Sequence, residues 1–119
     1  MSIISDLALK LIGDKKRWRA YKARVRDLPD NYRETVDAFE RYLMFWGPGD
    51  ADDAASLLEN MAELFEQSAA DRIPIREVVG NDPVAFIEEM VRNYPSGDWR
   101  AKEKNRLIES VDRAVKNQS

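Results

Sequence analysis

Residues 50–71 read DADDAASLLENMAELFEQSAAD and carry a clear helical pattern. Asp50 is placed to cap a helix start, and Asp52 and Asp53 fall in the first turn, where negative charge suits the helix dipole. The apolar residues that follow recur every three or four positions, which is the period of one helix face: Leu57, Leu58, Met61, Leu64 and Phe65. The segment predicts an amphipathic helix that ends near Asp71.

The same period continues toward the N-terminus. Residues 31–46 predict a well-buried helix that begins at a capping box formed by Asn31 and Glu34. Its apolar face holds Tyr32, Val36, Phe39, Leu43 and Trp46, widened by Ala38, Tyr42 and Phe45. Pro29 separates this helix from residues 3–28, which form either two helices, with Gly13 ending the first, or one kinked helix. We favour two.

Toward the C-terminus the pattern breaks into shorter pieces. Residues 47–49, Gly-Pro-Gly, form a helix-to-helix turn. Pro74 starts a brief helix that ends at Gly80, and Asp82 caps another that has Pro83 at its first position. Residues 94–97 predict a second break, after which a last helix begins near Asp98. Its apolar residues are Trp99, Leu107, Ile108, Val111, Ala114 and Val115.

These elements predict an all-α fold, because the chain offers no convincing strand and no internal repeat. We expect a bundle of three longer helices with a shorter-helix appendage. The length of 119 residues and the mass of 13.7 kDa correspond to one domain, residues 1–119. Within it, residues 1–72 hold the N-terminal helices, and residues 73–119 hold the short helices and the C-terminal helix.

The composition excludes several kinds of chemistry. The chain has no Cys and no His, which removes zinc sites of the usual kind, thiol nucleophiles and imidazole bases. The acidic run at residues 50–53 fails as a calcium loop because its later ligand positions are apolar. Acidic pairs such as Glu88 with Glu89 and Glu34 with Asp37 show no convergence on a pocket. We therefore predict no catalytic residue, no metal and no cofactor.

The chain is expected to be cytoplasmic. The apolar residues 3–12 are interrupted by Asp6 and Lys10, and no basic stretch precedes them, so they make a poor signal peptide. No apolar run approaches the roughly 20 residues needed to span a bilayer.

A basic stripe formed by Lys15, Arg19, Lys22 and Arg26 shares one helix face. Residues 1–28 carry eight basic and three acidic groups, whereas residues 29–119 carry eleven basic and nineteen acidic groups. The stripe could bind phosphates of nucleic acid or of a membrane surface. It could equally pair with the acidic stripe of Glu59, Glu63 and Glu66, and we favour this internal pairing.

The three tryptophans divide into two kinds. Trp18 and Trp46 lie on apolar helix faces and are expected in the core. Trp99 precedes a largely polar stretch, so it is either a hydrophobic lid on the bundle or an exposed contact residue. We favour the lid, and keep Trp99 with the basic stripe as the candidate contact surface.

Several segments together resemble the small all-helical bacterial family of unknown function of the DUF1048 type. The resemblance covers roughly residues 4–110 and rests on core and capping residues. They are residues 12–16, Trp18, Arg19, Leu28, Pro29, Tyr32, Tyr42, Leu43, residues 64–66, Val79, Gly80, Asp82 and Phe86. It implies a multihelical fold, no known activity and genes often found beside regulators of the PadR type. The break at residues 47–49 and Pro83 depart from the family pattern.

Three functions remain open from the sequence. The first is a non-enzymatic protein–protein interaction or regulatory accessory module, with a protein partner or a second copy as a homodimer. The second is nucleic-acid or anionic-surface binding through residues 15–26, against which the acidic remainder of the chain argues. The third is a small-ligand binder or enzyme that uses carboxylates and aromatics.

Overall fold

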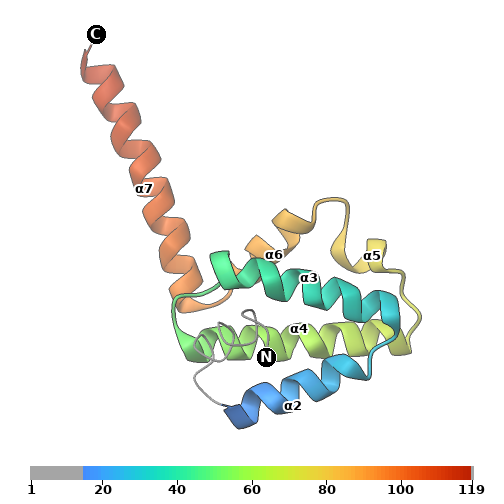
Figure 1. The fold of residues 1–119 in the computed structure, drawn as a ribbon. Coiled ribbons are helices and arrows are strands. Elements are labelled where there is room, and N and C mark those ends of the chain that lie inside the picture. Colours follow the sequence, from blue (N-terminus) through green and yellow to red (C-terminus); the bar gives the residue numbers. More distant parts are fainter. Residues whose placement is uncertain (1–14, 119) are drawn as a thin grey trace.

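The computed structural model describes residues 15–118 and places them in helices joined by turns (Figure 1). In chain order the helices are α2 (Lys15–Arg26), α3 (Asp30–Trp46), α4 (Ala51–Ala70), α5 (Ile75–Val79), α6 (Pro83–Arg92) and α7 (Pro95–Gln118). No strand occurs within these residues, so the all-α prediction is confirmed. Whether residues 3–28 form one helix or two depends on residues 3–14, which lie outside the described part.

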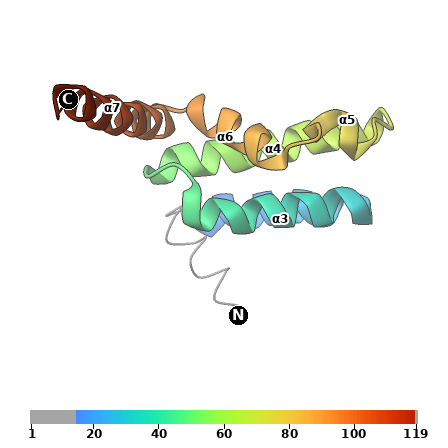
Figure 2. The same ribbon diagram turned by 90° about the horizontal axis from the view of Figure 1, so that it is seen from above.

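The body of the molecule is a bundle of three helices in which α4 packs against both α2 and α3, and α2 also contacts α3 (Figures 1 and 2). Helix α2 runs parallel to α4, because Arg17 pairs with Glu59 and Arg24 pairs with Glu66. Helix α3 runs antiparallel to α4, because Tyr32 near its start hydrogen-bonds the Ile73 carbonyl just beyond the end of α4. The core lies between these helices and α6, and its buried side chains include Trp18, Tyr21, Val25, Val36, Phe39, Leu57, Leu58, Met61, Phe65 and Ile87.

Two of the predicted caps are confirmed. The Asp50 carboxylate accepts a 3.0 Å hydrogen bond from the Asp53 amide, and Asp82 caps α6 in the same way through the Ala85 amide. The capping box at Asn31 and Glu34 is wrong, since α3 begins at Asp30 with Pro29 in the cap position and no side-chain cap. Proline holds the entering backbone extended, and Asp30 itself supplies the negative charge of the first turn.

The predicted break between the last two helices is present but shorter than expected, because α6 ends at Arg92 and α7 starts at Pro95 rather than near Asp98. Proline is well suited to the first helical position, where its missing N–H is not needed. The next amide, of Ser96, donates to the Asp53 carboxylate at 3.2 Å, and the Ser96 hydroxyl donates to the same oxygen at 2.8 Å. Helix α4 thus fixes the start of α7.

Helix α7 meets the body only near its first residues, and the rest of the helix projects away from the body (Figures 1 and 2). Every residue from 104 to 118 is exposed. The C-terminal helix is the longest helix of the described residues, at 24 residues.

Candidate interaction surfaces

The basic stripe is split by the way α2 packs. Lys15, Arg19 and Arg26 are exposed and form no ion pair with any residue between 15 and 118. Lys22 instead turns toward α3, where its ammonium lies 3.3 Å from the Glu40 carboxylate and 3.8 Å from Asp37. Three of the four predicted contact residues on α2 thus face solvent together.

Two members of the acidic stripe on α4, Glu59 and Glu66, form ion pairs, but with different cations from those expected. Arg17 donates to both Glu59 oxygens at 2.7 and 3.1 Å and also reaches Asp52 at 3.1 Å. Arg24 pairs with Glu66 at 2.5 Å. The pairing of the stripe itself with α4 is therefore wrong. Arg17 and Arg24 lie seven residues apart beside the buried Tyr21, and that edge of α2 is the one that meets α4.

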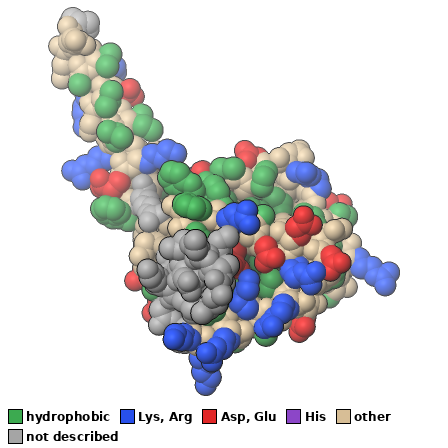
Figure 3. All heavy atoms as spheres, viewed as in Figure 1, with side chains coloured by type: hydrophobic (Ala, Val, Ile, Leu, Met, Phe, Trp, Pro, Cys, Tyr) green, Lys and Arg blue, Asp and Glu red, His purple; other side chains and the backbone are tan. Residues whose placement is uncertain are grey.

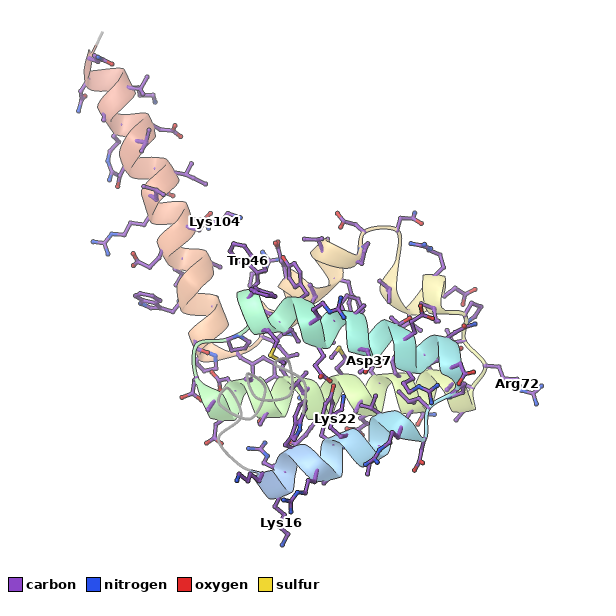
Figure 4. All side chains as sticks on the ribbon, in the orientation of Figure 1. Lys16, Lys22, Asp37, Trp46, Arg72 and Lys104 are labelled. Carbon is purple, nitrogen blue, oxygen red and sulfur yellow. The ribbon has the colours of Figure 1, made fainter. Side chains whose placement is uncertain are left out.

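A buried carboxylate joins α2 to α3. Glu40 is only 4% exposed, and it accepts a 3.0 Å hydrogen bond from the Tyr21 hydroxyl as well as the ammonium of Lys22. The ammonium also lies over the Trp18 ring, 5.3 Å from its centroid. Figure 4 shows Lys22 and Asp37 between the helices of the body. Two side chains, Tyr21 and Lys22, thus supply the hydrogen bonds of the buried Glu40 carboxylate.

Burial is the main cause of two pKa shifts in this network. Loss of hydration raises the pKa of Glu40, although Lys22 and the Tyr21 hydroxyl oppose the shift. Loss of hydration and the Glu40 charge raise the pKa of Tyr21 well above its usual range. Neither Tyr21 nor Glu40 lines either of the two grooves described below. The network thus orients α2 against α3.

The importance of Glu40 did not emerge from the sequence, although a signal was present. Val36, Glu40 and Leu43 follow the spacing i, i+4 and i+7, so the carboxylate interrupts an apolar helix face. An acidic residue at such a position indicates a buried partner.

Trp18 is 7% exposed, as the sequence predicts, but the other two tryptophans differ from expectation. Trp46 is 64% exposed and its neighbour Phe45 72%, and Ala38 is exposed as well, so α3 is less buried than predicted and the placement of Trp46 in the core is wrong. Trp99 is also 64% exposed, because α7 carries it away from the body, so the lid prediction is wrong.

A groove of about 560 Å³ lies where α3, α6 and the start of α7 meet. Tyr42 and Trp46 come from α3, Arg92 comes from α6, and Ala101 and Lys104 come from α7. Figure 4 shows Trp46 and Lys104 directed toward each other across this space. The groove thus has one aromatic wall and two basic groups at its rim.

The side of α7 that continues from this groove is apolar. Four of its side chains are half or more exposed, and Figure 3 shows hydrophobic groups along the side of the helix that faces the body. They are Leu107 (65%), Ile108 (50%), Val111 (52%) and Val115 (59%). We call these four residues and Ala114 the α7 face.

A second groove, of about 430 Å³, lies between α3 and α5 and includes Glu34, Thr35 and Arg76. Glu34 lies there without Asp37, which pairs with Lys22, and Glu88 lines the other groove. The acidic pairs noted in the sequence are therefore not brought together. Among residues 15–118 no group of three acidic side chains is placed to hold a metal ion.

None of the described helices combines the length and the apolar character required to cross a bilayer. The fold and these surfaces define an all-α protein with a helical body and a projecting, partly apolar C-terminal helix. Residues 9–112 match the family described as Protein of unknown function (DUF1048), and the chain belongs to that family. Among curated proteins, no match to the chain is found.

Proposed function

We propose that the protein is a non-enzymatic interaction module that binds another protein chain through the α7 face and the adjoining groove. Its role would be that of a regulatory accessory protein, and a regulator of the PadR type is the first partner to test. The proposal is supported by one observation above all: a long helix presents a contiguous apolar face that the described body does not cover.

A contiguous apolar patch exposed to water is less common on protein surfaces than isolated apolar side chains, and it calls for an explanation. Isolated apolar side chains are common on protein surfaces, but contiguous apolar patches usually mark a binding site. The α7 face is contiguous, because its residues recur at helical spacing over positions 107–115. A helix that presents such a face is suited to pack against a second helix.

The groove beside it adds the features that interfaces favour. Tryptophan and arginine are over-represented among residues that dominate binding energy, and the groove contains Trp46 and Arg92. The polar rim expected around an apolar interface is present as Lys104 and Glu88.

Site-specific photocross-linking in cells that make the protein tests this proposal. A benzophenone-bearing amino acid replaces Val111 in one variant and Glu109, on the opposite side of the same helix, in the control. We expect Val111 to give one dominant adduct, identified by mass spectrometry as one protein species, and Glu109 to give little. Equal and diffuse labelling from both positions would contradict an interaction role for the α7 face.

A second candidate function is favoured by the exposure of Lys15, Arg19 and Arg26 on one side of α2. Three cations without intramolecular partners among the described residues could bind an anionic polymer or membrane surface. We expect any such binding to be weak and to decline steeply between low and physiological salt. Fluorescence anisotropy with mixed-sequence DNA and RNA, and sedimentation with anionic vesicles, measure it. Replacing all three residues by Gln should abolish it, and replacing Lys22 alone should not.

A further inference from the structure

The apolar residues of α7 are arranged symmetrically about Val111. Leu107 and Ile108 precede it by four and three positions, and Ala114 and Val115 follow it by three and four. Read in either direction from Val111, the apolar positions are the same. This symmetry is a property of the face itself and does not depend on how α7 meets the body.

This spacing follows from the helical period, and it also allows a twofold interface. In a homodimer with twofold symmetry the same patch is used on both subunits, so the patch must be complementary to itself. When two copies of α7 pack antiparallel with the axis at Val111, Leu107 lies opposite Val115 and Ile108 opposite Ala114.

The ends of the two helices are also complementary in charge. In this register the position opposite Lys104 is Gln118 of the other copy, the last residue of its α7. The unpaired carbonyl groups at a helix C-terminus carry partial negative charge, which favours a neighbouring cation. Lys104 points into the groove beside Trp46, so the end of the second helix would also meet the exposed indole ring.

The exposed apolar area of α7 is large enough for this arrangement, and the helical bodies of the two copies do not collide in it. The α7 face and Trp46 offer exposed apolar area on the order of 500 Å². A standard interface buries about 800 Å² per subunit, of which about 65% is apolar in homodimers. Pro95 lies 16 residues before Val111, about 24 Å along the helix, so the two bodies occupy opposite ends of the pair.

We propose that the protein forms a homodimer in which two α7 helices pack antiparallel about a twofold axis at Val111, with the end of each helix entering the groove at Trp46 of the other copy. This inference rests on the proposed interaction role of the α7 face and names its partner as a second copy of the chain.

Sedimentation velocity of the purified full chain tests the self-association. The wild type should sediment as a species of twice 13.7 kDa. Val111→Asp should raise the dissociation constant by about 100-fold or more, because two carboxylates would face each other inside an apolar contact. Val84→Asp, the same change at an exposed valine of α6, is the matched control and should leave the dimer intact.

Cysteine cross-linking tests the orientation, since the chain contains no cysteine of its own. Val111→Cys should form a disulfide-linked dimer under mild oxidation. Lys104→Cys and Gln118→Cys should each fail to do so alone, whereas an equal mixture of the two should give the mixed dimer. Efficient self-linking of the Lys104→Cys variant would indicate a parallel pair and would overturn the antiparallel arrangement.

The two proposals fail in distinguishable ways. A wild-type chain that remains monomeric at about 100 μM overturns the homodimer, because a contact of standard size should be populated there. If the Val111 photocross-link in cells still identifies a different protein, the interaction role stands and only the second copy is excluded. If the Val84→Asp control dissociates as readily as Val111→Asp, the dimer uses another surface and the inference also fails.

Discussion

The Tyr21 hydroxyl donates a 3.0 Å hydrogen bond to the Glu40 carboxylate, and both side chains are buried where α2 meets α3. Lys22 approaches the same carboxylate from the outer side of α2 at 3.3 Å. A buried carboxylate is tolerated only when such partners replace its hydration. The stability of the body therefore depends on the protonation of Glu40 and on the presence of its partners Tyr21 and Lys22.

Glu40 should make the protein relatively more stable as the pH falls from neutral. Burial raises its pKa in the folded state, so the folded state holds more protons than the unfolded state between the two pKa values. The free energy of unfolding then falls as the pH rises through the folded-state pKa, and the contribution is fully present below the unfolded-state pKa. Urea unfolding between pH 7 and pH 4 should show the wild type gaining stability relative to Glu40→Gln.

The control for this measurement is Glu34→Gln on the exposed part of the same helix. Its free energy of unfolding should follow that of the wild type across the same pH range. A constant difference between wild type and Glu40→Gln would mean that folding leaves the pKa of Glu40 unchanged.

Replacing Lys22 alone should lower the free energy of unfolding more than replacing Lys22 and Glu40 together. Lys22→Met leaves the buried carboxylate with only the Tyr21 hydroxyl and should destabilise the protein by about 1–3 kcal/mol. Lys22→Met combined with Glu40→Met should recover most of that loss, because a buried ion pair is often replaceable by apolar side chains of similar size. Chemical denaturation of the two single variants and the double variant measures the coupling. Arg19→Met, on the exposed side of α2, should change stability by less than about 0.5 kcal/mol.

How far the sequence could predict this protein is shown by two pairs of residues. Asp50 and Asp82 cap helices as predicted, because capping is local and depends on residues within one turn. Trp18 and Trp46 both lie on apolar helix faces, yet only Trp18 is buried. Periodicity identifies an apolar face, but it does not say whether another element covers it.

The candidate contact surface shows the same limit. Arg17 and Arg24, rather than the predicted stripe, pair with α4, because the rotation of α2 about its axis is set by packing of the whole body. The sequence identifies the apolar residues of α7, but it does not show that they stay exposed. Their exposure depends on the direction that α7 takes after α6, and a local pattern does not specify this direction.

The two tryptophans should respond very differently to truncation. Trp18→Ala removes a buried ring from the core and should cost about 3–5 kcal/mol in the free energy of unfolding. Trp46→Ala removes an exposed ring and should cost less than about 1 kcal/mol in dilute solution. Urea denaturation followed by far-UV circular dichroism compares them without relying on tryptophan fluorescence. Similar losses from both changes would show that Trp46 is covered in solution.

Gly97 should control the direction of α7, because it lies where α6 and α7 approach most closely. A Cβ atom at this position would lie 2.1 Å from the Val91 carbonyl oxygen and 2.6 Å from the Val91 Cγ1 atom. Inside a helix, Gly→Ala normally stabilises by about 1 kcal/mol, but here the clash with backbone should reverse the sign. We expect Gly97→Ala to lower the free energy of unfolding by about 1–3 kcal/mol.

The control is Ser110→Ala, which tests helix propensity on the exposed part of α7 and should stabilise slightly. Denaturation of both variants gives the sign, and small-angle scattering shows whether the longest dimension of the Gly97→Ala chain changes. Since the clash involves backbone of α6, α7 must rotate or shift to relieve it, which would move the α7 face relative to Trp46. A Gly97→Ala variant that gains stability and keeps its dimensions would mean that this contact does not fix the corner.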